Sequence, residues 1–128
     1  MGVYVEWDNE ARTIILWTLD GRWTWGEYDE ALERAHKMVN SVSHPVDFIY
    51  DTTKMSIIPS DLITRFKNKY LAIPKEARLF LVVGADSYLQ LLWDSFTRLP
   101  YASHLKAYYF ETLEAARQFS QSYQPDSG

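Results

Sequence analysis

The sequence predicts a single α/β domain, a sandwich in which helices pack on a mixed, mostly parallel five-stranded sheet with an antiparallel N-terminal hairpin. Three observations lead to this fold class. Five short β-rich runs alternate with four amphipathic helical runs in the order ββαβαβαβα, which favours parallel pairing and right-handed crossovers. The length of 128 residues suits one domain. The prolines at positions 45, 59, 74 and 100 all fall at junctions between expected elements.

The first two strands are expected to pair as a hairpin. Apolar residues occupy every second position from Val3 to Trp7, which is the period of a half-buried strand. A second β-rich run covers Thr13–Leu19, and the turn residues Asp8-Asn9-Glu10 precede it. Because the connection is short and polar, antiparallel pairing is favoured.

A capping box predicts the start of the first helix. Thr24 and Glu27 have the T-x-x-E spacing, in which each side chain accepts a hydrogen bond from the other residue's backbone N–H. Apolar residues then recur at spacings of three and four, which places them on one buried face. These residues are Tyr28, Ala31, Leu32, Ala35, Val39 and Val42.

The middle of the chain is expected to form a strand and a second helix. The strand covers Val46–Tyr50 and ends at Asp51. The helix is expected to begin with Ser60 or Asp61 as its cap and to stop at Pro74. Its apolar face is supplied by Leu62, Ile63, Phe66, Tyr70 and Ile73.

Two more strands and two more helices follow. The run Leu79–Val83 is continuously apolar, which is the pattern of a strand buried on both faces. A third helix is expected from about Ser87 to Leu99, ended by Pro100, and a fifth strand over Ala107–Phe110.

Thr112 is expected to cap the last helix, which turns Leu113, Ala116, Phe119 and Tyr123 inward. The predicted domain therefore spans residues 1–123, and residues 124–128 are expected to form a frayed tail.

Composition narrows the function classes. A net charge of −4 disfavours nucleic acid as a partner, and the absence of Cys removes thiol nucleophiles and Cys-based zinc sites. The N-terminus has no basic region before an apolar run, and no apolar run approaches the length of a membrane span. A cytoplasmic protein without a membrane span is therefore expected.

The three histidines are poorly placed for catalysis. Ligands of open α/β sheets bind beyond the carboxyl ends of the strands, whereas His44 and His104 precede the third and fifth strands. His36 falls on the charged face of the first helix. No metal-binding, phosphate-binding or nucleophile-elbow motif occurs, so we expect no catalytic residue, no metal and no cofactor.

Polar residues cluster at the predicted carboxyl edge of the sheet, namely Asp51, Thr52, Thr53, Gly84, Asp86, Glu111 and Thr112. Asp51 is the most informative, because a strand-terminal Asp commonly accepts hydrogen bonds from the loop that follows it. The alternative, an acid–base pair of Asp51 and Asp86 in an enzyme, has no support from their spacing in the sequence.

The third helix has more apolar positions than one buried stripe requires. Tyr88 and Leu91 fall off the face formed by Leu89, Leu92, Trp93, Phe96 and Leu99. The surplus indicates a second contact, made with a homodimer partner, another protein or an apolar ligand. The alternative is a broadly buried helix. The candidate contact surface comprises Trp23, Trp25, Tyr88, Leu91, Trp93 and Tyr101.

Three features of the chain resemble the STAS-like domain family, relatives of bacterial anti-sigma factor antagonists. They are the element order, the segment from Phe48-Ile49-Tyr50-Asp51 to Ser60-Asp61-Leu62, and the closing Thr112-Leu113-Glu114-Ala115-Ala116. The resemblance covers nearly the whole chain. It places Ser60 at the position of the phosphorylated Ser in an Asp-Ser-Ser-Gly-like stretch. The flanking Asp, the second Ser and the Gly of that stretch are absent here.

The resemblance implies a non-enzymatic regulatory module that acts by protein–protein contact. The expected contact or phospho-switch loop holds Asp51, Thr52, Thr53, Ser60 and Asp61, and the second and third helices extend it. The partner is expected to be another protein or a second copy, as a homodimer. The alternative hypothesis is a binder of a lipid or other apolar small molecule, since aromatic residues make up 16% of the chain.

Overall fold

The structure, a computed structural model, describes residues 2–59, 61–69 and 73–123, and its sheet has five strands in the order β1-β2-β3-β4-β5. The hairpin β1–β2 is antiparallel and the remaining pairs are parallel, so the predicted mixed sheet is confirmed. The strands are β1 (Gly2–Trp7), β2 (Ile14–Asp20), β3 (Val46–Asp51), β4 (Ala77–Val83) and β5 (Ala107–Phe110).

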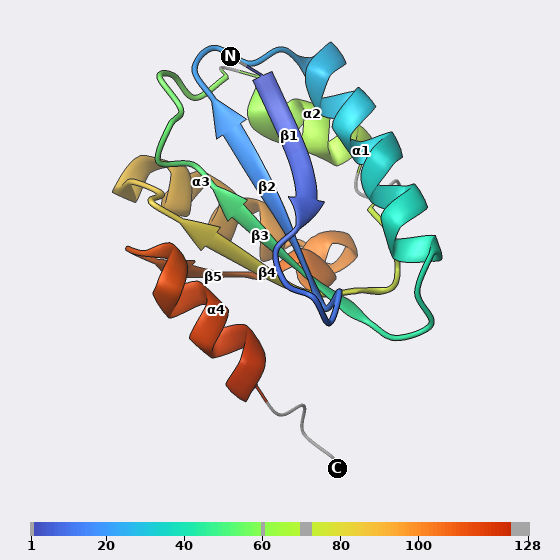
Figure 1. Ribbon diagram of the computed structural model, residues 1–128. Coiled ribbons are helices and arrows are strands. Elements are labelled where there is room, and N and C mark those ends of the chain that lie inside the picture. Colours follow the sequence, from blue (N-terminus) through green and yellow to red (C-terminus); the bar gives the residue numbers. More distant parts are fainter. Residues whose placement is uncertain (1, 60, 70–72, 124–128) are drawn as a thin grey trace.

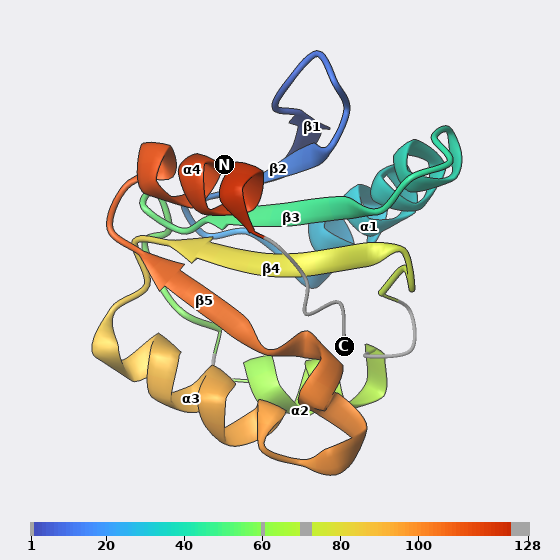
Figure 2. The same ribbon diagram turned by 90° about the horizontal axis from the view of Figure 1, so that it is seen from below.

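Helices cover both faces of the sheet. The helices α2 and α3 lie on one side and α4 lies on the other (Figure 2), while α1 packs along the hairpin side of the sheet (Figure 1). The helices are α1 (Trp25–Asn40), α2 (Leu62–Lys69), α3 (Ser87–Thr97) and α4 (Leu113–Ser122), with a 3-10 helix at Pro100–Leu105.

Alternation along the strands divides the apolar core into two layers. On β2, Ile15 and Trp17 face the layer under α1, α2 and α3, whereas Ile14 and Leu16 face α4. The layer under the three helices holds most of the large rings. The predicted face of α1 is buried from Tyr28 to Val39, whereas Val42 lies beyond the end of the helix and is partly buried. Both hydrogen bonds of the capping box are present.

The segment after α3 differs from the prediction. The helix α3 ends at Thr97 instead of Leu99, and the chain then forms the unpredicted 3-10 helix. Pro100 explains both changes, because a residue before proline avoids the helical region and Leu99 is extended at φ −68°, ψ 137°. Proline is also favoured at the first position of a helical turn, where its missing N–H leaves no hydrogen bond unmade.

The predicted second helix is longer than α2, which is assigned over Leu62–Lys69. Tyr70 lies outside the described residues. Ile73 lies beyond α2 but is buried in the same core layer, 7% exposed. Residues 124–128 also lie outside the described residues, so the domain boundary at 123 stays a prediction.

Two long-range ion pairs attach α4 and its neighbourhood to the sheet. Asp47 is buried on β3 and accepts two hydrogen bonds from Arg78, at 2.8 and 2.7 Å, and one from the Ser120 hydroxyl. The hydrogen bond to Asp47 raises the pKa of Arg78. Arg117 on α4 pairs in the same bidentate manner with Asp8, with both distances at 2.8 Å.

Candidate contact surface and internal cavity

The loop after β3 is held by its own polar side chains. One Asp51 carboxylate oxygen accepts hydrogen bonds from the backbone N–H and the hydroxyl of Thr53, at 2.9 and 2.6 Å. The Thr52 N–H and hydroxyl both donate to the carbonyl of Val83, at 2.9 and 2.7 Å. Asp51 therefore acts as the acceptor of an Asx-type turn, and Thr52 ties the loop to the end of β4.

The loop after β4 packs closely against this turn. Gly84 has φ +79°, and a Cβ there would lie 2.5 Å from the Thr53 methyl carbon. Asp86 caps α3 by accepting the Leu89 N–H at 2.8 Å. Two carboxylates of the predicted edge, Asp51 and Asp86, thus hold backbone groups in place.

A surface groove runs between these two loops. Its volume is about 360 Å³. On the side of the first loop, the groove is anchored to the end of β2, because the Gly21 N–H donates to the Lys54 carbonyl and the Ser56 N–H donates to the Gly21 carbonyl. The lining residues are Thr52, Thr53, Met55, Ser56, Ile57, Ile58, Gly84, Ala85, Asp86 and Leu89.

Ser60, the predicted phosphosite, lies outside the described residues, so its role stays a prediction. Asp61 is described and joins α1 to α2. It accepts a hydrogen bond from the Trp25 indole N–H at 3.0 Å and another from Arg65 at 3.1 Å, and these bonds lower the pKa of Asp61. The Arg65 guanidinium also lies over the Trp25 ring, 5.8 Å from its centroid.

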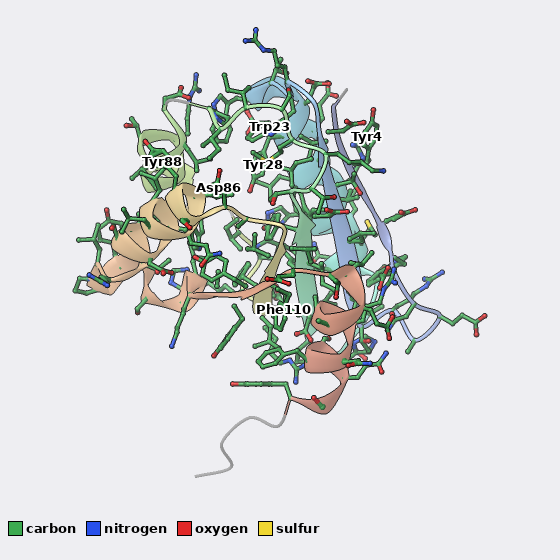
Figure 3. All side chains as sticks on the ribbon, turned by 90° about the vertical axis from the view of Figure 1, so that its left-hand side faces the viewer. Tyr4, Trp23, Tyr28, Asp86, Tyr88 and Phe110 are labelled. Carbon is green, nitrogen blue, oxygen red and sulfur yellow. The ribbon has the colours of Figure 1, made fainter. Side chains whose placement is uncertain are left out.

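The outer face of α3 and the following 3-10 helix expose apolar side chains. Tyr88 is 59% exposed and Leu91, one turn later, is 64% exposed. Leu99, which was expected on the core-facing stripe, lies beyond the end of α3 and is 36% exposed. Tyr101 continues this surface with 40% exposure. Figure 3 shows Tyr88 at the start of α3, on the opposite side of the view from Tyr4. We call Tyr88, Leu91, Leu99 and Tyr101 the α3 patch.

The prediction that Trp23 belongs to a contact surface was wrong. Trp23 is only 8% exposed, and its ring packs against Trp25 and Tyr28, with centroids 4.9 and 6.0 Å apart. Trp23 precedes the cap Thr24, and Tyr28 is the fourth residue of α1, so the two form a hydrophobic staple. That spacing is readable in the sequence and was the signal that the prediction missed.

Trp93 also turns inward instead of joining the α3 patch. Its side chain is partly buried against the core, and its indole N–H donates to the Leu105 carbonyl at 3.0 Å. Trp25 is partly buried as well, between Trp23, Tyr28 and Asp61. Of the predicted contact residues, the structure therefore exposes Tyr88, Leu91 and Tyr101.

An apolar cavity of about 80 Å³, partly open to solvent, lies between the sheet and the helices on its larger core layer. Among the described residues no polar atom faces it. Burial raises the pKa of two phenols in its wall, Tyr28 and Tyr50. The lining residues are Leu19, Trp23, Tyr28, Tyr50, Thr52, Met55, Leu62, Ile73, Phe80, Val82, Leu89, Trp93, Leu105 and Tyr109.

Comparison with solved structures identifies the fold. An uncharacterized protein of the DUF3478 family from Shewanella loihica PV-4, described as having a SpoIIAA-like fold, matches with a TM-score of 0.68 and 12% identity over 92% of this chain and 93% of that chain. The chain has the SpoIIAA-like fold. An anti-sigma-factor antagonist (STAS) domain protein from Planctomyces limnophilus also matches, with a TM-score of 0.52 and 11% identity over 94% of this chain and 99% of that one.

These likenesses confirm the STAS-like resemblance at the level of the SpoIIAA-like fold. No family model and no curated protein matches the sequence. Within residues 2–59, 61–69 and 73–123, no helix has the length and apolar character needed to cross a membrane. The same residues contain no group of three or more His, Asp or Glu side chains arranged to hold a metal ion.

Proposed function

We propose that this protein is a non-enzymatic STAS-like module that acts by protein–protein contact, and that the α3 patch contacts a second copy of the chain. The observation that carries the proposal is the exposure of Tyr88 and Leu91, which lie one helical turn apart on a helix whose other face is already packed on the core. Apolar side chains that face water in this way mark interaction surfaces.

The charge of this surface supports self-association. Between Ser87 and Tyr101 the charged residues are Asp94 and Arg98, one of each sign. Asp94 accepts a hydrogen bond from the Tyr109 hydroxyl at 2.8 Å. Two copies of an apolar surface without net charge meet in a symmetric contact without electrostatic repulsion.

The carboxyl edge supports a module without catalysis. Asp51 and Asp86 are the carboxylates that an acid–base mechanism would use, and both accept backbone hydrogen bonds that shape the loops. The loop from Thr52 onward then serves as a second, polar part of the contact surface, beside the start of α3.

The test measures oligomeric mass for the wild type, for Tyr88→Ser/Leu91→Ser and for the control Tyr4→Ser. Tyr4 is 50% exposed on β1, so its replacement removes an exposed aromatic side chain comparable to Tyr88 at a site away from α3. Sedimentation and native mass spectrometry are expected to give twice the 15.0 kDa chain mass for the wild type and for Tyr4→Ser. The double variant is expected to raise the dimer dissociation constant at least tenfold.

A wild-type protein that stays monomeric at millimolar concentration would contradict self-association. Equal dimer affinities for the double variant and the wild type would place the interface elsewhere. A complex that forms only with another protein, and that Tyr88→Ser/Leu91→Ser abolishes, would replace the second copy by that partner.

A further inference from the structure

The apolar cavity and the surface groove adjoin each other, and the residues that line both form the boundary between them, which we call the wall. Thr52, Met55 and Leu89 line both spaces. Thr52 is held at the end of β4 by two hydrogen bonds to the Val83 carbonyl, so this part of the wall is fixed. Met55 is an unbranched side chain with three rotatable bonds, and such a side chain moves aside at low cost. The movable part of the wall is therefore the side chain of Met55.

We propose that the cavity and the groove together bind a single-chain amphiphile whose head group is uncharged or cationic. The cavity offers no hydrogen-bonding atom among the described residues, so it suits a methyl-terminated alkyl chain. Apolar cavities of comparable kind stay dry and accept small apolar molecules. Its volume of about 80 Å³ accepts the last few carbons of a chain, which would enter from the groove past Met55.

The groove supplies the surroundings of the head group. The hydroxyl-bearing residues Thr53 and Ser56 line it, together with the Asp86 carboxylate. A hydroxyl or ammonium head group finds acceptors there, and an ammonium is attracted to Asp86. A carboxylate head group is repelled by the same charge. This charge separates neutral or cationic amphiphiles from fatty acids.

The test uses three ligands with one chain length: 1-octanol, octylamine and octanoate. Each is titrated at pH 7 into the wild-type protein, and methyl NMR spectra are recorded. Saturable shifts are expected for the methyl groups of Leu19, Met55 and Leu105, which line the cavity. The methyl groups of Leu16 and Ile49, in the core layer on the other face of the sheet, are expected to stay in place.

Octanoate is expected to bind at least tenfold more weakly than 1-octanol or octylamine. If all three bind equally, the head-group assignment is overturned while the cavity site stands. If no ligand gives saturable shifts at the cavity residues, the whole proposal is overturned. Shifts confined to residues of the α3 patch would also overturn it, because they would report adsorption to the exposed apolar surface.

A matched pair of valine variants locates the bound chain. Val82 lines the cavity, whereas its neighbour Val83 points to the opposite core layer. Val82→Ile adds one methylene to the cavity and is expected to weaken octanol binding about fourfold, the value of one displaced methylene of ligand. Val83→Ile is expected to leave the affinity unchanged. Equal effects of the two variants would refute binding in the cavity.

Discussion

The cavity makes an unusual prediction about stability: the same substitution at two adjacent residues of β4 changes stability in opposite directions. Val82 lines the cavity, where a further methylene enters empty space. Val83 is 1% exposed and packs in the core layer under α4. Neither substitution alters the β-branched character that suits a strand, so the difference between the variants reports packing alone.

The magnitude follows from the volume. The cavity of about 80 Å³ has room for one more methylene, and burying one methylene contributes at most about 0.8 kcal/mol. Part of this gain is offset because the longer side chain loses rotamer freedom. Val82→Ile is therefore expected to raise the free energy of unfolding by about 0.5 kcal/mol. Val83→Ile overpacks a filled site and is expected to lower it by about 1–3 kcal/mol.

Urea denaturation followed by tryptophan fluorescence measures both changes as shifts of the midpoint at constant slope. The five tryptophans give the signal. A decrease in stability for Val82→Ile comparable to that for Val83→Ile would refute the reasoning, because it would mean that the space beside Val82 is filled in solution.

Three further predictions test other parts of the structure. Asp47→Ala removes the acceptor of Arg78 and is expected to lower stability by about 2–3 kcal/mol in urea denaturation. This is the low end for a broken buried pair, because Arg78 is partly exposed. The double variant Asp47→Ala/Arg78→Met should recover part of the loss, and no recovery would argue against a pairing role. Gly84→Ala forces a Cβ towards Thr53 at positive φ and is expected to cost about 1–3 kcal/mol. Gly26→Ala lies in α1, where the new Cβ would make only an ordinary contact with Thr24 Oγ1 at 3.8 Å, and it is expected to gain about 0.5–1 kcal/mol. The same sign for both variants in thermal melts would contradict the local geometry. Asp61 has a lowered pKa in the folded state, so its contribution to stability is present above its unfolded pKa of about 4 and is lost as pH falls through the folded value. The stability difference between the wild type and Asp61→Asn should therefore shrink as the pH of the melts is lowered from about 6 to about 3. A constant difference would rule out the hydrogen bonds from Trp25 and Arg65 as the cause of the lowered pKa.

Local patterns predicted most of the fold because they act over a few residues. The capping box of Thr24 and Glu27 and the alternation along β2 are set by spacing alone, and both hold in the structure. The turn acceptor Asp51 belongs to the same class. The exposure of Tyr88 and Leu91 also followed from helical periodicity, since their positions fall off the core-facing stripe.

Features that depend on distant residues could not be predicted in this way. The pair of Asp8 and Arg117 joins residues 109 positions apart, and it exists only because α4 packs over the sheet at one register. The hydrogen bond of the Trp93 indole likewise depends on the 3-10 helix, which brings the Leu105 carbonyl within its reach. The cavity is the hardest feature to predict from the sequence. Its volume is the space between the sheet and the helices that the side chains leave unfilled, and no single residue determines it.

The aromatic content of the chain offers a physical reason for the cavity. Trp17, Tyr28, Phe48, Tyr50 and Phe80 form a chain of ring contacts across the larger core layer. Planar rings prefer a few offset or edge-to-face arrangements, and a side chain with two torsion angles cannot adjust its shape to fill a gap. A layer built from such rings therefore retains space that aliphatic side chains would fill. The aromatic residues of this core layer therefore account both for the high aromatic fraction of the chain and for the space at the proposed site.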